Sequence, residues 1–231
     1  MGREERQHRS HEWMYSRDRK SETFSRCAGA IPVANNSHSQ YCCSSDWGAV
    51  PPPPRKATPN VPDTPLQVTS DGEGVTIPFD AVAAYHGHAA LAMLALTFQG
   101  LRGALALLSP DRPAPRSDLS VLCGHPGPGV RDAIEFVTRA VTRGAYQVDL
   151  TLPEARLNPY LDISYSFRVT LGERMVCAAL RPGVLPPRFF ELVGTPPDRR
   201  GPGFAAEFAA LKRSIAVDAL REAPDALYDL R

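Results

Sequence analysis

The spacing of apolar residues changes along the chain, and the change divides the chain near residue 62. Before that point polar and charged residues dominate, and no helical or strand-like apolar periodicity is sustained. A proline tract then leads into a region where apolar residues recur every second residue or about every 3.6 residues. We therefore expect a disordered N-terminal extension with a proline-rich linker over residues 1–62, dispensable for folding, and a single folded domain over residues 63–231.

Three segments of this domain have the apolar pattern of helices. Residues 89–108 are rich in alanine and leucine and apolar on nearly all sides, which predicts a central buried helix. Its small residues, Gly100 and Gly103 among them, would let another element approach closely. Residues 130–144 have apolar positions at helical spacing with Gly144 as a stop, and residues 205–223 predict an amphipathic helix that ends the fold.

Alternating apolar and polar residues predict the strands. Residues 118–123 and 146–152 each form one strand, and residues 164–180 form a hairpin that turns at Gly172. The order of helices and strands predicts an α+β fold, with an antiparallel or mixed sheet packed against the buried Ala/Leu-rich helix.

Composition excludes several classes of partner. The chain has 26 Lys and Arg against 25 Asp and Glu, so no strong field attracts nucleic acid or an acidic membrane surface. Gln99 and Arg102 interrupt the longest apolar run, so we expect no membrane span. No apolar segment near the start is long enough for a secretory signal, and we expect a cytoplasmic protein.

Histidines stand immediately before the Ala/Leu-rich segment. His86 and His88 are two residues apart, whereas neighbours on a helix face are three or four apart, so Gly87 must place them in a loop or a frayed first turn. Asp132 and Glu135, three residues apart, predict a solvated side of the second helix.

Cys123 and His125 share one face of the strand that ends there, which admits a nucleophilic pair. Cys123 also continues the apolar face of its strand, and this favours a buried, inert thiol. Cys177 lies on the inner face of the hairpin, and we expect it to be a buried, inert thiol as well.

Three stretches resemble, in order and spacing, landmarks of the FmdE-like family, which is named after an accessory component of formylmethanofuran dehydrogenase. Residues 86–88 match its His-Gly-His motif, residues 132–134 match Asp-Ala-Ile of the second landmark, and Arg181-Pro182 matches the turn that ends its third, a hairpin. The match covers about residues 77–193. The fold that the resemblance implies is the α+β fold expected from the pattern.

The chain departs from the family at its cysteines. The two cysteine positions fall on Ala90 and Gly129, and no cysteine follows Cys177, so the C-terminal zinc ribbon that many relatives have is absent. Without these thiolates, a metal site would use nitrogen and oxygen donors. The candidate ligands for a transition metal such as zinc are three histidines, His86, His88 and His125, with Asp132 or water.

Two alternatives to a metal site stay open at this point. In one, His86 caps a helix or bonds a backbone carbonyl and His88 packs in a polar pocket; in the other, the histidines perform acid/base chemistry without a metal. The resemblance implies a metal- or small-ligand-binding accessory protein related to molybdenum or tungsten formylmethanofuran dehydrogenase in one-carbon metabolism. The alternative function is a metal-free, degenerate relative that serves as an interaction or oligomerisation module. The expected partners are a second copy in a homodimer or a larger enzyme complex. No complete catalytic set, substrate or reaction is evident.

Overall fold

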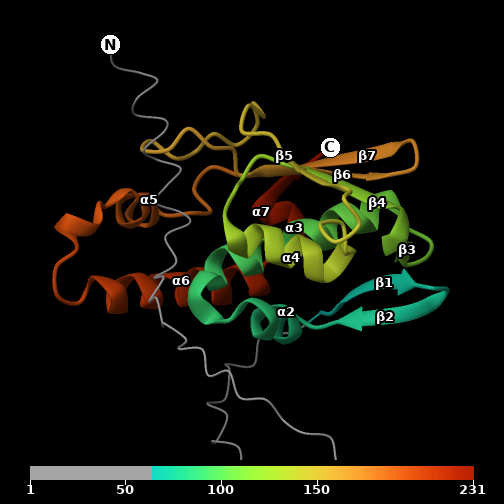
Figure 1. The fold of residues 1–231 in the computed structure, drawn as a ribbon, viewed down its shortest axis with the longest axis horizontal. Helices are drawn as coiled ribbons and strands as arrows, with labels where there is room; N and C mark the ends of the chain where they lie inside the picture. Colours follow the sequence, from blue (N-terminus) through green and yellow to red (C-terminus); the bar gives the residue numbers. More distant parts are fainter. Residues whose placement is uncertain (1–63) are drawn as a thin grey trace, which may run out of the picture. The chain divides into compact units, whose positions relative to one another are not determined.

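The computed structural model describes residues 64–231, which fall within one compact unit, Pro59–Arg231 (Figure 1). The expectation for residues 1–62 lies outside the described residues. The first described strand begins at Leu66, close to the predicted start of the domain.

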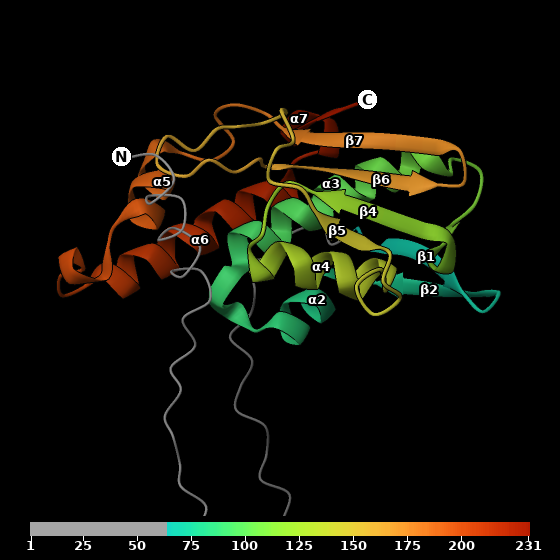
Figure 2. The same ribbon diagram turned by 45° about the horizontal axis from the view of Figure 1, so that its top comes forward.

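The larger of the two sheets is mixed and has five strands in the order β5-β4-β6-β7-β8. β4 and β5 are parallel, and the other neighbouring strands are antiparallel. Helices pack against the sheet, which confirms the α+β fold (Figure 2). The five strands are β4 (Leu119–Cys123), β5 (Tyr146–Val148), β6 (Ser166–Leu171), β7 (Arg174–Leu180) and β8 (Tyr228–Leu230).

The predicted hairpin is confirmed, because β6 and β7 pair in antiparallel register from Ser166–Ala179 to Leu171–Arg174. The strand expected over 146–152 is shorter than predicted and ends at Val148, since a turn begins within the next two residues. The fold also does not end in a helix: a short helix and β8 follow, and β8 pairs with β7.

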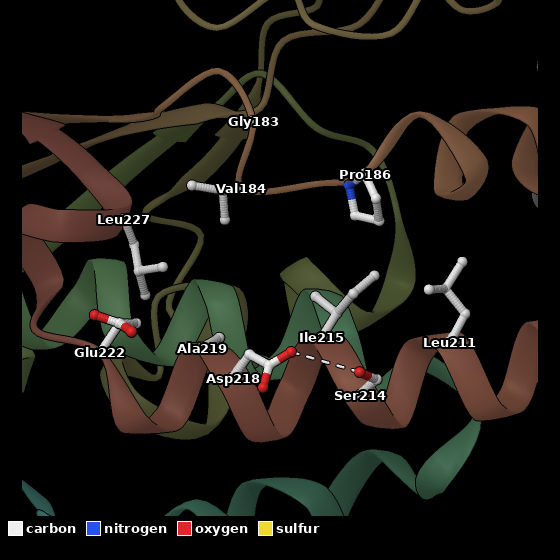
Figure 3. A pocket seen from close by; sticks show the side chains of 10 residues that line it. All are labelled: Gly183, Val184, Pro186, Leu211, Ser214, Ile215, Asp218, Ala219, Glu222 and Leu227. Carbon is white, nitrogen blue, oxygen red and sulfur yellow. Dashed lines mark hydrogen bonds between the residues drawn. The ribbon is translucent and has the colours of Figure 1, made fainter.

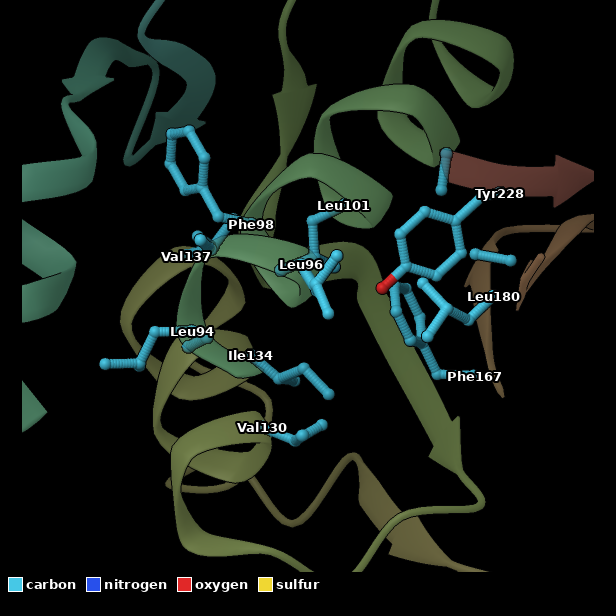
Figure 4. Close-up of a cluster of buried hydrophobic side chains, with 14 of the residues drawn as sticks. Leu94, Leu96, Phe98, Leu101, Val130, Ile134, Val137, Phe167, Leu180 and Tyr228 are labelled. Atoms are coloured by element: carbon cyan, nitrogen blue, oxygen red, sulfur yellow. The ribbon is translucent and has the colours of Figure 1, made fainter. Parts of the chain in front are cut away.

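The Ala/Leu-rich segment is the central helix α3 (Leu91–Leu108), as predicted, and its apolar side chains are buried on nearly all sides (Figure 4). Its glycines meet neighbours at close range. A methyl group at Gly100 would lie 2.8 Å from Cζ of Phe167, and one at Gly103 would lie 2.6 Å from Cδ1 of Leu230. The sheet and its last strand therefore occupy the small-residue face of α3.

The second predicted helix is α4 (Pro128–Thr138), which ends six residues before Gly144, so the predicted end is wrong. Arg139 adopts a left-handed conformation with φ of 56° and terminates the helix. The carboxylate of Glu135 accepts hydrogen bonds from the backbone N–H groups of Val141 (2.8 Å) and Thr142 (3.1 Å). Glu135 is thus buried and holds the turn after the helix, so the prediction of a solvated side is wrong for this residue.

Smaller elements complete the domain. A three-stranded sheet has the order β2-β1-β3, with β1 antiparallel to β2 and parallel to β3. The predicted C-terminal amphipathic helix is α6, whose C-terminal half contributes the buried residues. The remaining elements are β1 (Leu66–Ser70), β2 (Glu73–Ile77), α2 (Phe79–His86), η1 (His88–Ala90), β3 (Ala114–Pro115), η2 (Arg116–Asp118), α5 (Pro187–Gly194), η3 (Pro197–Arg199), α6 (Phe204–Arg221) and α7 (Pro224–Leu227).

The segment His88–Leu108 is long and apolar enough to span a membrane by length and composition, which the sequence analysis did not expect. In the structure, 72% of its most apolar window is buried within the domain. The central helix of a folded domain has the same length, apolar composition and burial.

Candidate functional site

His86 is the last residue of α2. It contacts Asp132, which lies in the stretch that resembles the second landmark of the FmdE-like family. Gly87, with φ of +84°, ends the helix and separates it from η1, so the histidines lie on either side of this break and not together in a loop or a frayed first turn. His86 Nδ1 donates a hydrogen bond to Oδ2 of Asp132 on α4, at 2.8 Å. Because the carboxylate only accepts, Nδ1 carries the proton and the lone pair of a neutral His86 lies on Nε2.

His88 and Arg131 flank this pair. His88 begins η1 and is exposed, not packed in a polar pocket. Arg131 Nη1 lies 3.5 Å from Oδ1 of Asp132, so both oxygens of that carboxylate face a donor. The pair links the end of α2 to the first turns of α4, two segments 46 residues apart in the sequence.

His125 has a structural role in the loop between β4 and α4. Its Nδ1 accepts a hydrogen bond from the backbone N–H of Gly127 at 2.9 Å, and its ring stands edge-on to Tyr165 with 4.9 Å between centroids. Burial lowers the pKa of His125 to about 4, so the ring is neutral near pH 7 and its remaining proton is on Nε2. Neither ring nitrogen is therefore available to a metal without breaking this arrangement.

The four candidate ligands do not come together as a set. The structure pairs His86 with Asp132, but within residues 64–231 no three His, Cys, Asp or Glu side chains lie close enough to hold a metal ion. The two positions that the resemblance aligns with cysteines are in contact: a methyl group at Gly129 would lie 2.6 Å from Cβ of Ala90. The donor set that the described residues present does not fit a transition metal.

The two described cysteines are buried. Burial raises the pKa of Cys123 to about 11, and Sγ of Cys123 contacts the backbone of His125, not its ring. Burial likewise raises the pKa of Cys177. Since the thiolate is the reactive form, this environment favours the inert thiols that the strand pattern indicated.

A cavity of about 360 Å³ lies between α6 and the segment 183–186 (Figure 3). We call it the α6 pocket. Apolar side chains from α6 face others from the opposite segment and from α7. The apolar side chains that line it are Val184, Pro186, Leu211, Ile215, Ala219 and Leu227.

Polar groups line only the α6 side of the pocket. Ser214, Asp218 and Glu222 stand four residues apart, one turn after another, and Ser214 Oγ donates to Asp218 Oδ2 at 3.4 Å. Within residues 64–231 neither carboxylate forms an ion pair with a cationic side chain.

A buried glutamine on α3 fixes the end of α6 that forms this wall. Gln99 Nε2 donates to the carbonyl oxygens of Ala219 (2.7 Å) and Glu222 (3.0 Å). Gln99 is 0% exposed, and its Oε1 has no hydrogen-bond partner among the described residues. Gln99 does not line the cavity itself, but it anchors the end of α6 next to Asp218 and Glu222.

A second cavity, of about 350 Å³, borders the same segment, and Gly183 lines both cavities. Tyr160, Phe190 and Leu185 line it, and Glu191 is its only acidic residue. Glu191 is already paired with Arg188 at 2.8 Å. This cavity offers apolar contact without an unpaired charge.

Sequence reasoning singled out the histidines and missed the α6 pocket. It predicted an amphipathic helix over residues 205–223, and two apolar residues of that segment, Leu211 and Ile215, line the cavity. The signal that points to the pocket is the placement of Asp218 and Glu222 at the C-terminal end of a helix, where acidic side chains are disfavoured. Segment 183–186 has no such signal, because its position depends on the fold.

Comparison of the sequence with protein-family models and with curated proteins finds no match in either.

Proposed function

We propose that this domain binds a small organic ligand in the α6 pocket. The observation that carries the proposal is the pocket itself: about 360 Å³, mostly apolar, with a few polar groups on one side. Ligand sites typically enclose about 300–1,000 Å³ and combine apolar walls with a small number of orienting polar groups. Small-ligand binding is one of the two roles that the resemblance to the FmdE-like family implies.

The same proposal places the chain as a divergent relative of the FmdE-like family, related to formylmethanofuran dehydrogenase and with a role in one-carbon metabolism. Two contacts support the relation. His86 of the first landmark is bonded to Asp132 of the second, and Ala90 contacts Gly129, so positions matched from separate stretches meet in space.

In this proposal the domain works without the metal that the resemblance implies. The described ligand candidates do not converge, and His125 is committed to the Gly127 turn. His86 and Asp132 serve as a clamp between α2 and α4.

The interaction-module alternative has little support at the glycine-bearing face of α3. The glycines of α3 are packed against residues of the same domain, so that face is not free for a second copy. An exposed edge remains at β5, where Val148 is 45% exposed, but that strand has only three residues.

The experiment is a titration of the full chain with 1-hexanol, an uncharged apolar probe, followed by calorimetry or by chemical shifts. Ser214→Trp introduces a large side chain at the exposed rim of the pocket and should abolish binding. Arg213→Trp, at the neighbouring exposed position of the same helix, is the matched control and should bind as the wild type does. Equal binding by both variants would place the probe elsewhere and refute the proposal.

A further inference from the structure

We infer that the α6 pocket selects an aliphatic ammonium ligand, whose alkyl chain fills the apolar part and whose ammonium group faces Asp218 and Glu222. The inference rests on the proposed function, since it concerns the ligand of the same cavity. It adds the charge and the orientation of the occupant.

The negative charge beside the cavity is uncompensated. Asp218 and Glu222 both line the cavity, and neither pairs with a cation within residues 64–231. Arg181 Nε donates to the carbonyls of Asp225 (3.0 Å) and Tyr228 (3.2 Å), and neither Arg181 nor Arg221, which is adjacent to Glu222 in sequence, lines the cavity. A ligand cation would supply the missing partner.

The direction of α6 also favours a cation. The helix has 18 residues and ends at Arg221, so the negative end of its dipole coincides with the position of Glu222. Acidic side chains here oppose the dipole and reduce helix stability, whereas a bound cation is favoured by both the dipole and the carboxylates. The arrangement attracts cations at this end of the pocket and repels anions.

The polar side chains that line the cavity also favour a donor. Asp218 and Glu222 present carboxylate oxygens, and the hydroxyl group of Ser214 already donates to Asp218. No free donor therefore remains among the described side chains that line the cavity. An ammonium group carries three donors and no acceptor, which is the complement of such a wall.

The apolar half explains why the cation should carry an aliphatic chain. Ile215 and Leu227 are buried and face Val184 across the cavity (Figure 3). A hydrated inorganic cation would leave this surface uncovered, while an alkyl chain would remove it from water at about 25 cal/mol per Å².

The test compares two probes of equal chain length, hexylammonium and 1-hexanol, titrated into the full chain at pH 7 and low salt. We expect hexylammonium to bind at least about ten-fold more tightly, because hydrogen bonds to charged groups are stronger than those between neutral groups. The preference should weaken as salt is added, since the carboxylates are at the exposed rim. Hexanoate, with the opposite charge, should bind more weakly than hexanol.

Asp218→Asn/Glu222→Gln should reduce hexylammonium binding to the level of hexanol and leave hexanol binding unchanged. Glu73→Gln/Glu173→Gln removes the same charge from two exposed positions outside the pocket and should keep the wild-type preference. Equal affinity of the two probes in the wild type would overturn the inference but leave the proposed function standing. Absence of binding by either probe would overturn both.

Discussion

Two polar regions of the domain, the histidine junction and the α6 pocket, differ in how completely their groups are satisfied. The histidine junction consists of His86, Asp132, Ala90 and Gly129. The carboxylate of Asp132 faces two donors, and the methyl group of Ala90 contacts the backbone of Gly129. At the α6 pocket, Asp218 and Glu222 border an open cavity and form no ion pair within residues 64–231.

The difference shows that residue type alone is a poor guide to where a ligand binds. Histidines attract attention because they serve as metal ligands and bases, but a histidine already bonded within the fold contributes to stability. Acidic residues on a helix are ordinarily solvated, yet they become informative when they border an apolar space without a partner. The junction should therefore respond to mutation mainly in stability, and the pocket mainly in binding.

The largest expected effect is at Gly129. Gly129→Ala would place a methyl group 2.6 Å from Cβ of Ala90, which is too close for packing. We expect the free energy of unfolding to fall by about 1–3 kcal/mol, as for other overpacked sites. Urea denaturation of the variant and of Ala90→Gly/Gly129→Ala measures this, and the double variant should regain part of the loss. If the single variant were as stable as the wild type, the contact would not be as tight as described.

Protonation of His125 should change the free energy of unfolding by a similar or smaller amount. Its pKa is about 4 when folded, against an ordinary value near 6.5, so the unfolded chain binds more protons between these values. This contribution is constant above about pH 6.5, and as the pH falls toward 4 the free energy of unfolding should decrease by at most about 3 kcal/mol.

The measurement is urea denaturation at pH 7 and pH 4.5 for the wild type and two variants. His125→Phe removes the titrating group and keeps an aromatic ring beside Tyr165, so it should lose this part of the pH dependence. His88→Gln, at an exposed position, should keep it. Identical pH dependence in the wild type and in His125→Phe would contradict the assignment.

A smaller effect is expected at the His86–Asp132 pair, whose side chains are 11% and 24% exposed. His86→Gln should lower the free energy of unfolding by about 1 kcal/mol, the usual value of one hydrogen bond. Zinc added to the wild-type chain should leave its melting temperature unchanged. A rise with zinc in the wild type that is lost in His86→Gln would instead identify a metal site at the junction.

The smallest stability effect is expected in the pocket. Asp218→Asn/Glu222→Gln changes exposed groups that oppose the dipole of α6, so the free energy of unfolding should stay within about 0.5 kcal/mol of the wild type or rise slightly. Thermal melts of the double variant check this. A marked loss of stability would indicate that the carboxylates support the fold and were not retained for a ligand.

Much of the fold was predictable because it follows local periodicity. The apolar run of α3, the strand ending at Cys123 and the β6–β7 hairpin each have one dominant spacing. The early end of α4 was not predictable, since it depends on the left-handed backbone of Arg139 and on the buried carboxylate of Glu135.

The candidate site was predictable only in part. Gly87 indicated that the two histidines lie in a loop or a frayed first turn, but only Gly87 itself is outside a helix: His86 ends α2 and His88 begins η1. The hydrogen bond from Gly127 to His125 could not be inferred, because it depends on the path of a Gly/Pro loop. The α6 pocket depends on segment 183–186 lying opposite α6, a tertiary contact that no spacing in the sequence encodes.

The central claim is that a ligand binds at the α6 pocket and not at the histidine junction. Amide ¹H–¹⁵N correlation spectra of the full chain, recorded during titration with hexylammonium, locate the site directly. The account predicts saturable shifts in residues 183–186, 211–222 and at Leu227, with residues 86–90 and 124–132 unperturbed. Shifts centred on His86 and Asp132, with none along α6, would contradict it.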